Sequence, residues 1–185
     1  RGARRAPGEG GMRRLAPLLV LALGCAGTTS PPATTAQAAE TQATGRSVRD
    51  LALETYPDAG RHAFAEDLGH VVVIDAWATW CPPCVRSLPL LQTLQEDYAA
   101  RGVRVYAVSI DDDRPQIPIF LARNKVQLTV LLDPGALLLE QKLALRQMPT
   151  TWVVDRTGQV RYTQEMAEDD LRDVRGQLDA LLKAP

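Results

Sequence analysis

The feature that most constrains this chain is a short segment in which a strand pattern gives way to a helix pattern across two cysteines. Residues 71–74 are the β-branched run Val-Val-Val-Ile, which predicts a strand buried on both faces of a helix-covered sheet. Beyond Cys84 the apolar residues recur at helical spacing, at Val85, Leu88, Leu91 and Leu94. Cys81 and Cys84 are therefore predicted to lie at the N-terminus of a helix.

This placement predicts redox chemistry for the two cysteines. At a helix N-terminus the unpaired backbone N–H groups and the positive end of the helix dipole favour a thiolate over a thiol. A lowered thiol pKa makes the exposed Cys81 the expected nucleophile, and Cys84, one turn further in, is placed to resolve a mixed disulfide. Pro82 and Pro83 suit the first helical turn, because the N–H that proline lacks would have no partner there.

This segment and a second one far downstream resemble the thioredoxin superfamily, and more narrowly the TlpA-like and ResA-like membrane-tethered thiol-disulfide oxidoreductases. The first match is residues 76–84, Ala-Trp-Ala-Thr-Trp-Cys-Pro-Pro-Cys, followed by Pro89, where such proteins kink the active-site helix. The second is residues 148–150, Met-Pro-Thr, where the family carries a cis-proline that faces the dithiol. The resemblance covers residues 48–182. It implies a thioredoxin-like three-layer α/β sandwich, with a mixed β-sheet and helices on both faces.

The resemblance also implies roles for single residues. Asp75, a charged residue in an apolar strand, matches the thioredoxin aspartate beneath the dithiol and is expected to accept the proton of Cys84; a partly solvated strand carboxylate is the alternative. Pro149, expected to be cis rather than an ordinary trans proline, would present the backbone of Met148 to an extended substrate segment. The other residues implied to contact substrate are Trp80, Pro82 and Thr150. One of Trp77 and Trp80 is expected to be a core aromatic.

The rest of the chain reads as strands and helices arranged around this segment. The expected elements are a hairpin of residues 48–56 and 62–64 with its turn at 57–60, a helix at 83–100, a strand at 103–110, a helix at 115–124, a strand at 128–132, a helix at 136–145, two antiparallel strands at 150–154 and 159–163, and a last helix capped by Asp169 or Asp170. Gly102 is the expected C-terminal cap of the helix after the cysteines. Because that helix separates the strands on either side of it, these two strands should be parallel.

Three adjacent acidic residues, Asp111, Asp112 and Asp113, follow the expected strand at 103–110. Asp113 is predicted to be the N-cap of the next helix. Neighbouring carboxylates also fit a metal site, but a solvated loop that caps a helix is the interpretation that we adopt.

The N-terminal part of this 185-residue chain is predicted to be a leader and a tether. Residues 13–23 combine two arginines with an apolar run too short to span a bilayer. Cys25 then follows a small residue, which resembles the lipobox of bacterial lipoproteins. We therefore assign residues 1–25 to a leader with a lipoprotein signal peptide, lipidated at Cys25; a plain cleaved signal and an uncleaved anchor are the alternatives. Residues 26–47 are predicted to be a disordered tether, and residues 48–185 a single thioredoxin-like domain.

The function implied by the resemblance is dithiol–disulfide exchange on exported proteins, with reduction as the expected direction, as in cytochrome c maturation. The expected partners are exported protein disulfides or thiols, a membrane electron donor and, through the lipid anchor, a membrane on its periplasmic side. The formal net charge of −1 gives no reason to expect a nucleic-acid partner. No metal is expected, and no cofactor other than the redox-active Cys81–Cys84 disulfide.

Other functions of the same fold are weighed against this one. A copper chaperone needs a further soft or imidazole ligand, but the only histidines, His62 and His70, precede the cysteines. A peroxidase pattern would place Thr three residues and Pro seven residues before the nucleophile, where this chain has Ala78 and Ile74. A thiol oxidant and a binding module with a structural disulfide stay open. Alkylation of reduced Cys81 separates the binding module from an enzyme, because a purely structural pair is inert.

Overall fold

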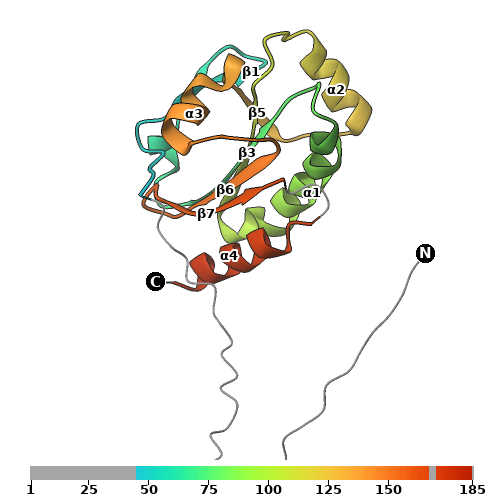
Figure 1. Cartoon of the computed structure of the whole chain (residues 1–185). Helices are drawn as coiled ribbons and strands as arrows, with labels where there is room; N and C mark the ends of the chain where they lie inside the picture. Colours follow the sequence, from blue (N-terminus) through green and yellow to red (C-terminus); the bar gives the residue numbers. More distant parts are fainter. Residues whose placement is uncertain (1–44, 167–169, 185) are drawn as a thin grey trace, which may run out of the picture. The chain divides into compact units, whose positions relative to one another are not determined.

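The computed structural model describes residues 45–166 and 170–184, and in them it confirms the predicted α/β sandwich (Figure 1). One mixed sheet of seven strands has the order β2-β1-β5-β4-β3-β6-β7 in this described part. The strands are β1 (Ala52–Tyr56), β2 (Arg61–Ala63), β3 (Val71–Trp77), β4 (Val103–Ser109), β5 (Thr129–Leu132), β6 (Thr150–Val154) and β7 (Val160–Glu165). The helices are α1 (Pro82–Tyr98), α2 (Gln116–Asn124), α3 (Leu137–Leu143) and α4 (Arg172–Lys183).

Strand β3 lies inside the sheet, between β4 and β6, and is buried along its whole length. As predicted, it runs parallel to β4, with Trp77 opposite Ser109; it runs antiparallel to β6, with Ala76 opposite Thr150. The C-terminal ends of β3 and β4 and the start of β6 therefore meet at one edge of the sheet. The chain leaves this edge from β3 through the cysteines into α1.

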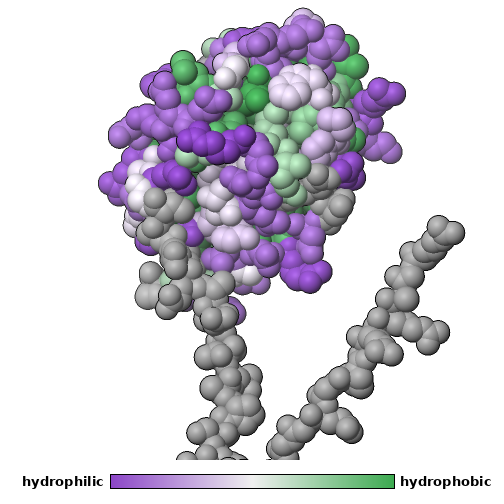
Figure 2. All heavy atoms as spheres, viewed as in Figure 1, coloured by the Kyte–Doolittle hydropathy of each residue, from purple (hydrophilic) through white to green (hydrophobic). Residues whose placement is uncertain are grey.

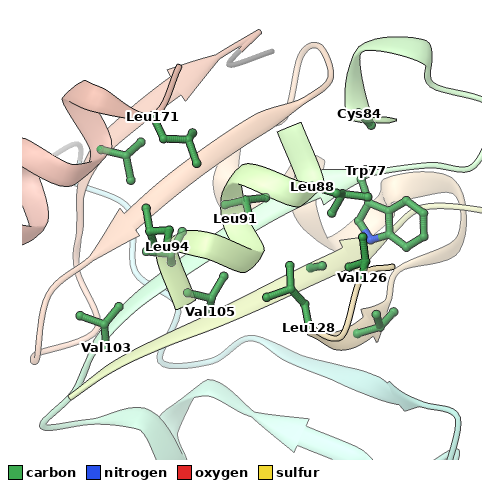
Figure 3. Packing of buried hydrophobic residues seen from close by; sticks show 14 of the residues in the cluster. Trp77, Cys84, Leu88, Leu91, Leu94, Val103, Val105, Val126, Leu128 and Leu171 are labelled. Carbon is green, nitrogen blue, oxygen red and sulfur yellow. The ribbon is translucent and has the colours of Figure 1, made fainter. Parts of the chain in front are cut away.

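Alternation along β3 sends its side chains into two separate apolar clusters. Val73 and Trp77 belong to the cluster that α1, α2 and α4 cover, whereas Val72 and Ile74 belong to the cluster beneath α3. Figure 1 shows α1 and α4 on one face of the sheet and α3 on the other. The first cluster is packed by the stripe Leu88, Leu91 and Leu94 of α1 (Figure 3). Each of these leucines is 0% exposed, and burial of such a side chain stabilises the fold by about 1.5–3 kcal/mol.

Helix α1 ends where the sequence predicts. It passes through Pro89 and continues as a short 3-10 turn, Ala99–Arg101. Gly102 then adopts the left-handed conformation at φ 83°, which glycine reaches without a steric penalty and which closes helices. The predicted hairpin is also confirmed as β1 and β2, and β1 pairs with β5 as well. Its turn contains a cis Tyr56–Pro57 peptide that the sequence analysis did not predict.

The predicted caps of α2 and α4 differ from the observed ones. Helix α2 has Pro115 as its N-cap without a side-chain hydrogen bond. Asp113 is therefore not the N-cap, because Pro115 is already helical and only the Asp113 backbone oxygen accepts from Gln116 N–H, at 3.2 Å. Helix α4 has Leu171 as its N-cap. The Asp170 carboxylate accepts from Arg172 N–H at 2.7 Å from just outside the helix, and Asp169 lies outside the described residues.

The described part begins next to β7. Val160 N–H donates to the Arg46 carbonyl at 2.9 Å, and Ser47 forms a bridge with Gln159. The predicted leader, Cys25 and most of the predicted tether lie outside the described residues. Among the helices of residues 45–166 and 170–184, none has the length and apolar character needed to cross a membrane. Polar residues cover most of the face seen in Figure 2, with small apolar areas among them.

Candidate active site

The two cysteines lie at the junction of β3 and α1, as predicted, and form a disulfide. Cys81 is the N-cap residue of α1, and its sulfur accepts a hydrogen bond from Cys84 N–H at 3.3 Å. Pro82 and Pro83 occupy the first two helical positions and have no N–H to donate. Cys84 therefore supplies the first amide of the helix, and that N–H is shared between the Cys81 sulfur and the Cys81 carbonyl, which accepts at 3.1 Å.

Cys81 is less exposed than the sequence analysis expected. It is 4% exposed and Cys84 is 0% exposed, because both side chains pack into the apolar cluster under α1. Figure 3 shows Cys84 near Trp77 and Leu88 of that cluster. Cys81 is still the more exposed residue of the pair, and its role as the attacking sulfur stays a prediction.

Asp75 lies in β3 on the face that carries Trp77, the face covered by α1, and it is 0% exposed. Its cross-strand neighbour Thr151 donates a hydrogen bond from Oγ1 to Asp75 Oδ1 at 2.7 Å. Oδ2 has no hydrogen-bond partner among the described residues. Burial raises the pKa of Asp75 to about 7, and the Thr151 hydrogen bond opposes this rise in part. The carboxylate can therefore take up and release a proton near neutral pH.

The Met148–Pro149 peptide is cis, which confirms that prediction. Because Thr150 pairs with Ala76, Pro149 lies at the edge of the sheet from which the chain leads to Cys81. The Pro149 carbonyl accepts from Met166 N–H at 2.7 Å. The Met148 backbone N–H and C=O make no hydrogen bond with the residues that the structure describes. These two groups are the kind that an added strand pairs with.

The other predicted contact residues differ in exposure. Trp80 is 64% exposed beside Cys81, and Pro82 is also exposed. Trp77 is the core aromatic of the pair, with its ring centroid 5.0 Å from that of Phe120. Thr150 is 1% exposed and its hydroxyl donates to the Gln147 carbonyl at 2.7 Å. The Thr150 hydroxyl already donates within the protein, and the predicted contact of Thr150 with substrate stays a prediction.

The sequence analysis missed Asp111 as part of this site. It was assigned to a solvated loop, whereas it is 2% exposed. Its carboxylate accepts hydrogen bonds from the backbone and hydroxyl of Thr79 and from the hydroxyl of Ser109. The one signal available was its place just after a strand parallel to β3, since such strands end at the same edge of the sheet.

The histidines lie elsewhere in the fold. His62 Nε2 is 2.7 Å from Asp67 Oδ2, and Tyr106 Oη donates to Asp67 Oδ1 at 2.8 Å. Arg104 also donates to the Asp67 carboxylate and lies 3.3 Å from His70 Nε2. Within residues 45–166 and 170–184, no group of three or more His, Cys, Asp or Glu side chains is arranged to hold a metal ion.

Comparison with known proteins agrees with this geometry. The Redoxin family model matches residues 38–180. The chain is 26% identical over 132 residues to the thiol-disulfide oxidoreductase ResA of Geobacillus thermodenitrificans, covering 70% of this chain and 75% of that relative. It is 28% identical over 112 residues to ResA of Geobacillus kaustophilus, covering 60% and 64%. The match thus spans between three fifths and three quarters of the length of these relatives.

Solved structures give the same picture. A protein of Chlorobium tepidum described as a thiol:disulfide interchange protein DsbE is 29% identical, with a TM-score of 0.66 over 74% of this chain and 96% of that one. StoA of Bacillus subtilis, at 17% identity, has a TM-score of 0.58 over 71% and 98% and shares the fold. The chain therefore belongs to the Redoxin family, and its fold and dithiol are those of a ResA-like thiol-disulfide oxidoreductase of the thioredoxin superfamily.

Proposed function

We propose that this protein is an exported, membrane-tethered reductase that transfers two electrons from the Cys81–Cys84 dithiol to disulfides of other exported proteins. The observation that carries the proposal is a disulfide at the N-terminus of α1, together with a buried acid on the face of the sheet that this helix covers. The Cys81 sulfur accepts a hydrogen bond from Cys84 N–H at 3.3 Å. Asp75 lies on the face of the sheet that α1 covers, and burial raises its pKa to about 7. Similarity to proteins named thiol-disulfide oxidoreductase ResA supports the reaction class.

The first step is attack by the Cys81 thiolate on one sulfur of a substrate disulfide. A mixed disulfide forms, and the other substrate sulfur leaves as a thiolate. The Cys84 N–H and the N-terminus of α1 stabilise the Cys81 thiolate before attack. Because the dithiol supplies the electrons, no further cofactor takes part in this step.

The second step releases the substrate. Cys84 attacks the Cys81 sulfur, the Cys81–Cys84 disulfide forms, and the second substrate sulfur leaves. Cys84 is fully buried in an apolar cluster and must lose its proton there. Asp75, whose Oδ2 has no partner among the described residues, accepts that proton. A membrane electron donor then regenerates the dithiol.

Substrate recognition by backbone pairing fits the free groups at the site. The N–H and C=O of Met148 make no hydrogen bond within the described part of the chain. An extended substrate segment pairs with these groups, beside cis-Pro149. The exposed ring of Trp80 and the exposed Pro82 flank Cys81 and contact the same segment.

The place where the predicted tether meets the domain is compatible with a membrane anchor, because it lies away from the dithiol. Arg46 pairs with Val160 at the start of β7, whereas Glu165 at the other end of β7 pairs with Thr150 next to the active site. The predicted tether thus joins the domain at the end of β7 away from the dithiol. Lipidation at Cys25 would anchor the chain to a membrane on the periplasmic side, where exported proteins such as those of cytochrome c maturation would be its substrates.

The reduction potential of the Cys81–Cys84 pair in the full chain tests the direction of electron flow. Equilibration with dithiothreitol or glutathione buffers is followed by tryptophan fluorescence, since Trp80 adjoins the disulfide and Trp77 shares its cluster. A value near or below about −250 mV supports a reductase. A value near about −120 mV assigns a thiol oxidant instead, and failure to exchange with any buffer identifies a structural disulfide.

A further inference from the structure

A buried carboxylate that the exchange steps do not use lies against the loop leading to Cys81. Asp111 Oδ1 accepts from Thr79 N–H at 3.0 Å and from Thr79 Oγ1 at 2.7 Å. Asp111 Oδ2 accepts from the same Thr79 N–H at 3.0 Å and from Ser109 Oγ at 2.8 Å. One side chain therefore holds both the main chain and the side chain of Thr79, two residues before Cys81.

We propose that Asp111 is a positioning residue for the dithiol. By holding Thr79 it fixes the loop of residues 78–81 and keeps the Cys81 sulfur on the Cys84 amide. The inference rests on thiol exchange at this pair, as the proposed function does, but on neither the direction of exchange nor the identity of the substrate.

The loop of residues 78–81 is a tight turn, so the position of Thr79 determines the position of Cys81. Cys81 N–H donates to the Ala78 carbonyl at 3.1 Å, which closes a tight turn with Thr79 and Trp80 at its centre. Trp80 is 64% exposed, so packing does little to hold its side of the turn. Thr79 is the central residue that is tied to the sheet, and Asp111 supplies the tie.

Asp111 is itself held firmly by β4. Its backbone N–H donates to Ser109 Oγ at 3.1 Å. Ile110 N–H donates to the Trp77 carbonyl at 3.0 Å, just beyond the paired strands β3 and β4. The carboxylate is thus a fixed acceptor at the end of a central strand, and the loop is oriented by it.

A carboxylate is the side chain that this geometry requires. The donors from Thr79 and Ser109 approach both oxygens, and an amide would turn one acceptor into a donor facing another donor. A buried charge is tolerated only when its hydrogen bonds are made. When the tie to Thr79 is lost, the Cys81 sulfur leaves the Cys84 amide for part of the time, and its thiolate is less stabilised.

The test compares three variants of the full chain. Thr79→Val removes the hydroxyl from which Asp111 Oδ1 accepts, and Thr79→Ser restores a hydroxyl. Tyr106→Phe is the control, because it removes a buried hydroxyl that donates to a different carboxylate, Asp67, and packs in the cluster beneath α3. Each reduced protein is alkylated with iodoacetamide from about pH 5 to pH 9, and the peptide that contains Cys81 is quantified by mass spectrometry, separately from Cys25.

The expected result is specific to the loop. Thr79→Val moves the pH of half-maximal Cys81 alkylation upward by about one unit, which makes the rate at lower pH roughly tenfold smaller. Thr79→Ser restores the wild-type profile. Tyr106→Phe lowers Tm and leaves the Cys81 alkylation profile unchanged. A Thr79→Val protein with a lower Tm and a wild-type profile overturns the proposal, and so does a Tyr106→Phe profile displaced as far as that of Thr79→Val.

Asp111→Asn tests the positioning role by the direction in which it moves the Cys81 alkylation profile along the pH axis. Loss of a nearby negative charge would by itself stabilise a thiolate and move the Cys81 profile to lower pH. Loss of positioning moves it to higher pH, which is the expected result; a displacement to lower pH contradicts the proposal. Alkylation involves no protein substrate, so a protein that fails to reduce protein disulfides, and so refutes the proposed function, still gives this readout.

Discussion

Replacement of Asp75 by asparagine should change how the stability of the oxidised protein depends on pH. Burial raises the pKa of Asp75 from its ordinary value of 3.8 to about 7. Below about pH 4 the folded and unfolded states both hold the proton, and the buried group costs nothing extra. Between about pH 4 and 7 the unfolded chain releases the proton and the folded protein keeps it, so wild-type stability falls as pH rises.

The size of this effect follows from the width of that pH window. It spans about three pH units, and each unit corresponds to about 1.4 kcal/mol. The free energy of unfolding of Asp75→Asn should therefore gain on that of the wild type by about 4 kcal/mol between pH 4 and pH 8. The gain should level off above about pH 7, where the folded wild type has also lost its proton. The new amide also loses or gains hydrogen bonds, but that contribution does not depend on pH.

Urea denaturation of the full oxidised chain, at pH values from about 4 to 8.5, measures the difference directly. All other titrating groups are common to the two proteins and cancel. Thr151→Val is the companion variant: it removes the hydrogen bond that opposes the rise in the Asp75 pKa, so its stability should go on falling to higher pH than that of the wild type. Wild-type and Asp75→Asn curves that stay parallel over the whole range would refute a proton held by Asp75. If Asp75→Asn resolves a mixed disulfide at the wild-type rate between about pH 6 and 9, Asp75 is not the acceptor of the Cys84 proton.

Three further changes test the site and its surroundings. Reduced Cys84→Ser incubated with oxidised glutathione should accumulate a mixed disulfide between Cys81 and one glutathione, with release of the other as a thiolate, visible by intact-protein mass spectrometry. A protein that forms no adduct at Cys81 would contradict the assigned order of attack. Pro83→Ala adds an N–H in the first turn of α1 and should raise the reduction potential by about 30 mV for each 1.4 kcal/mol gained by the thiolate; an unchanged potential means that the new amide does not reach the sulfur. Tyr106→Phe removes a donor from the buried Asp67 carboxylate and should cost about 1.5–3 kcal/mol in urea denaturation, with the potential unchanged because Tyr106 packs in the cluster beneath α3.

The features of the site that the sequence predicted are those that depend on residues close together in the chain. A β-branched run, two cysteines and a helical stripe are contiguous, so their pattern predicts that the two cysteines lie at the N-terminus of α1, as observed. The cis peptide before Pro149 was predicted from the Met-Pro-Thr match. Asp75 could be singled out because a charge in an apolar strand has few explanations other than burial with a function.

The part that the sequence could not predict depends on contacts between distant segments. Asp111 looks like the first of three solvated acids, and only the parallel register of β3 and β4 brings it against Thr79, 32 positions away. The low exposure of Cys81 has the same origin, since the sulfur enters a cluster assembled from several elements. Asp113 was assigned as a cap from local pattern, but Pro115 already starts the helical turn. Helix termini are decided by a few hydrogen bonds, and small differences move them by one or two residues.

The two buried aspartates of this site show how the number of donors decides what a carboxylate can do. Asp75 receives one hydroxyl at Oδ1, and its Oδ2 has no partner among the described residues, so its charged form is poorly stabilised and its pKa rises to about 7. Asp111 accepts hydrogen bonds at both oxygens and is held through its own N–H as well. The first arrangement suits an oxygen that must gain and lose a proton in each cycle, and the second suits one that must stay in place while Cys81 reacts. A hydrogen-bond donor added at Asp75 Oδ2 should therefore lower the pKa of Asp75 and slow proton transfer from Cys84 to it. The loop that carries Cys81 should stay in place, because its contacts with Asp111 are unchanged.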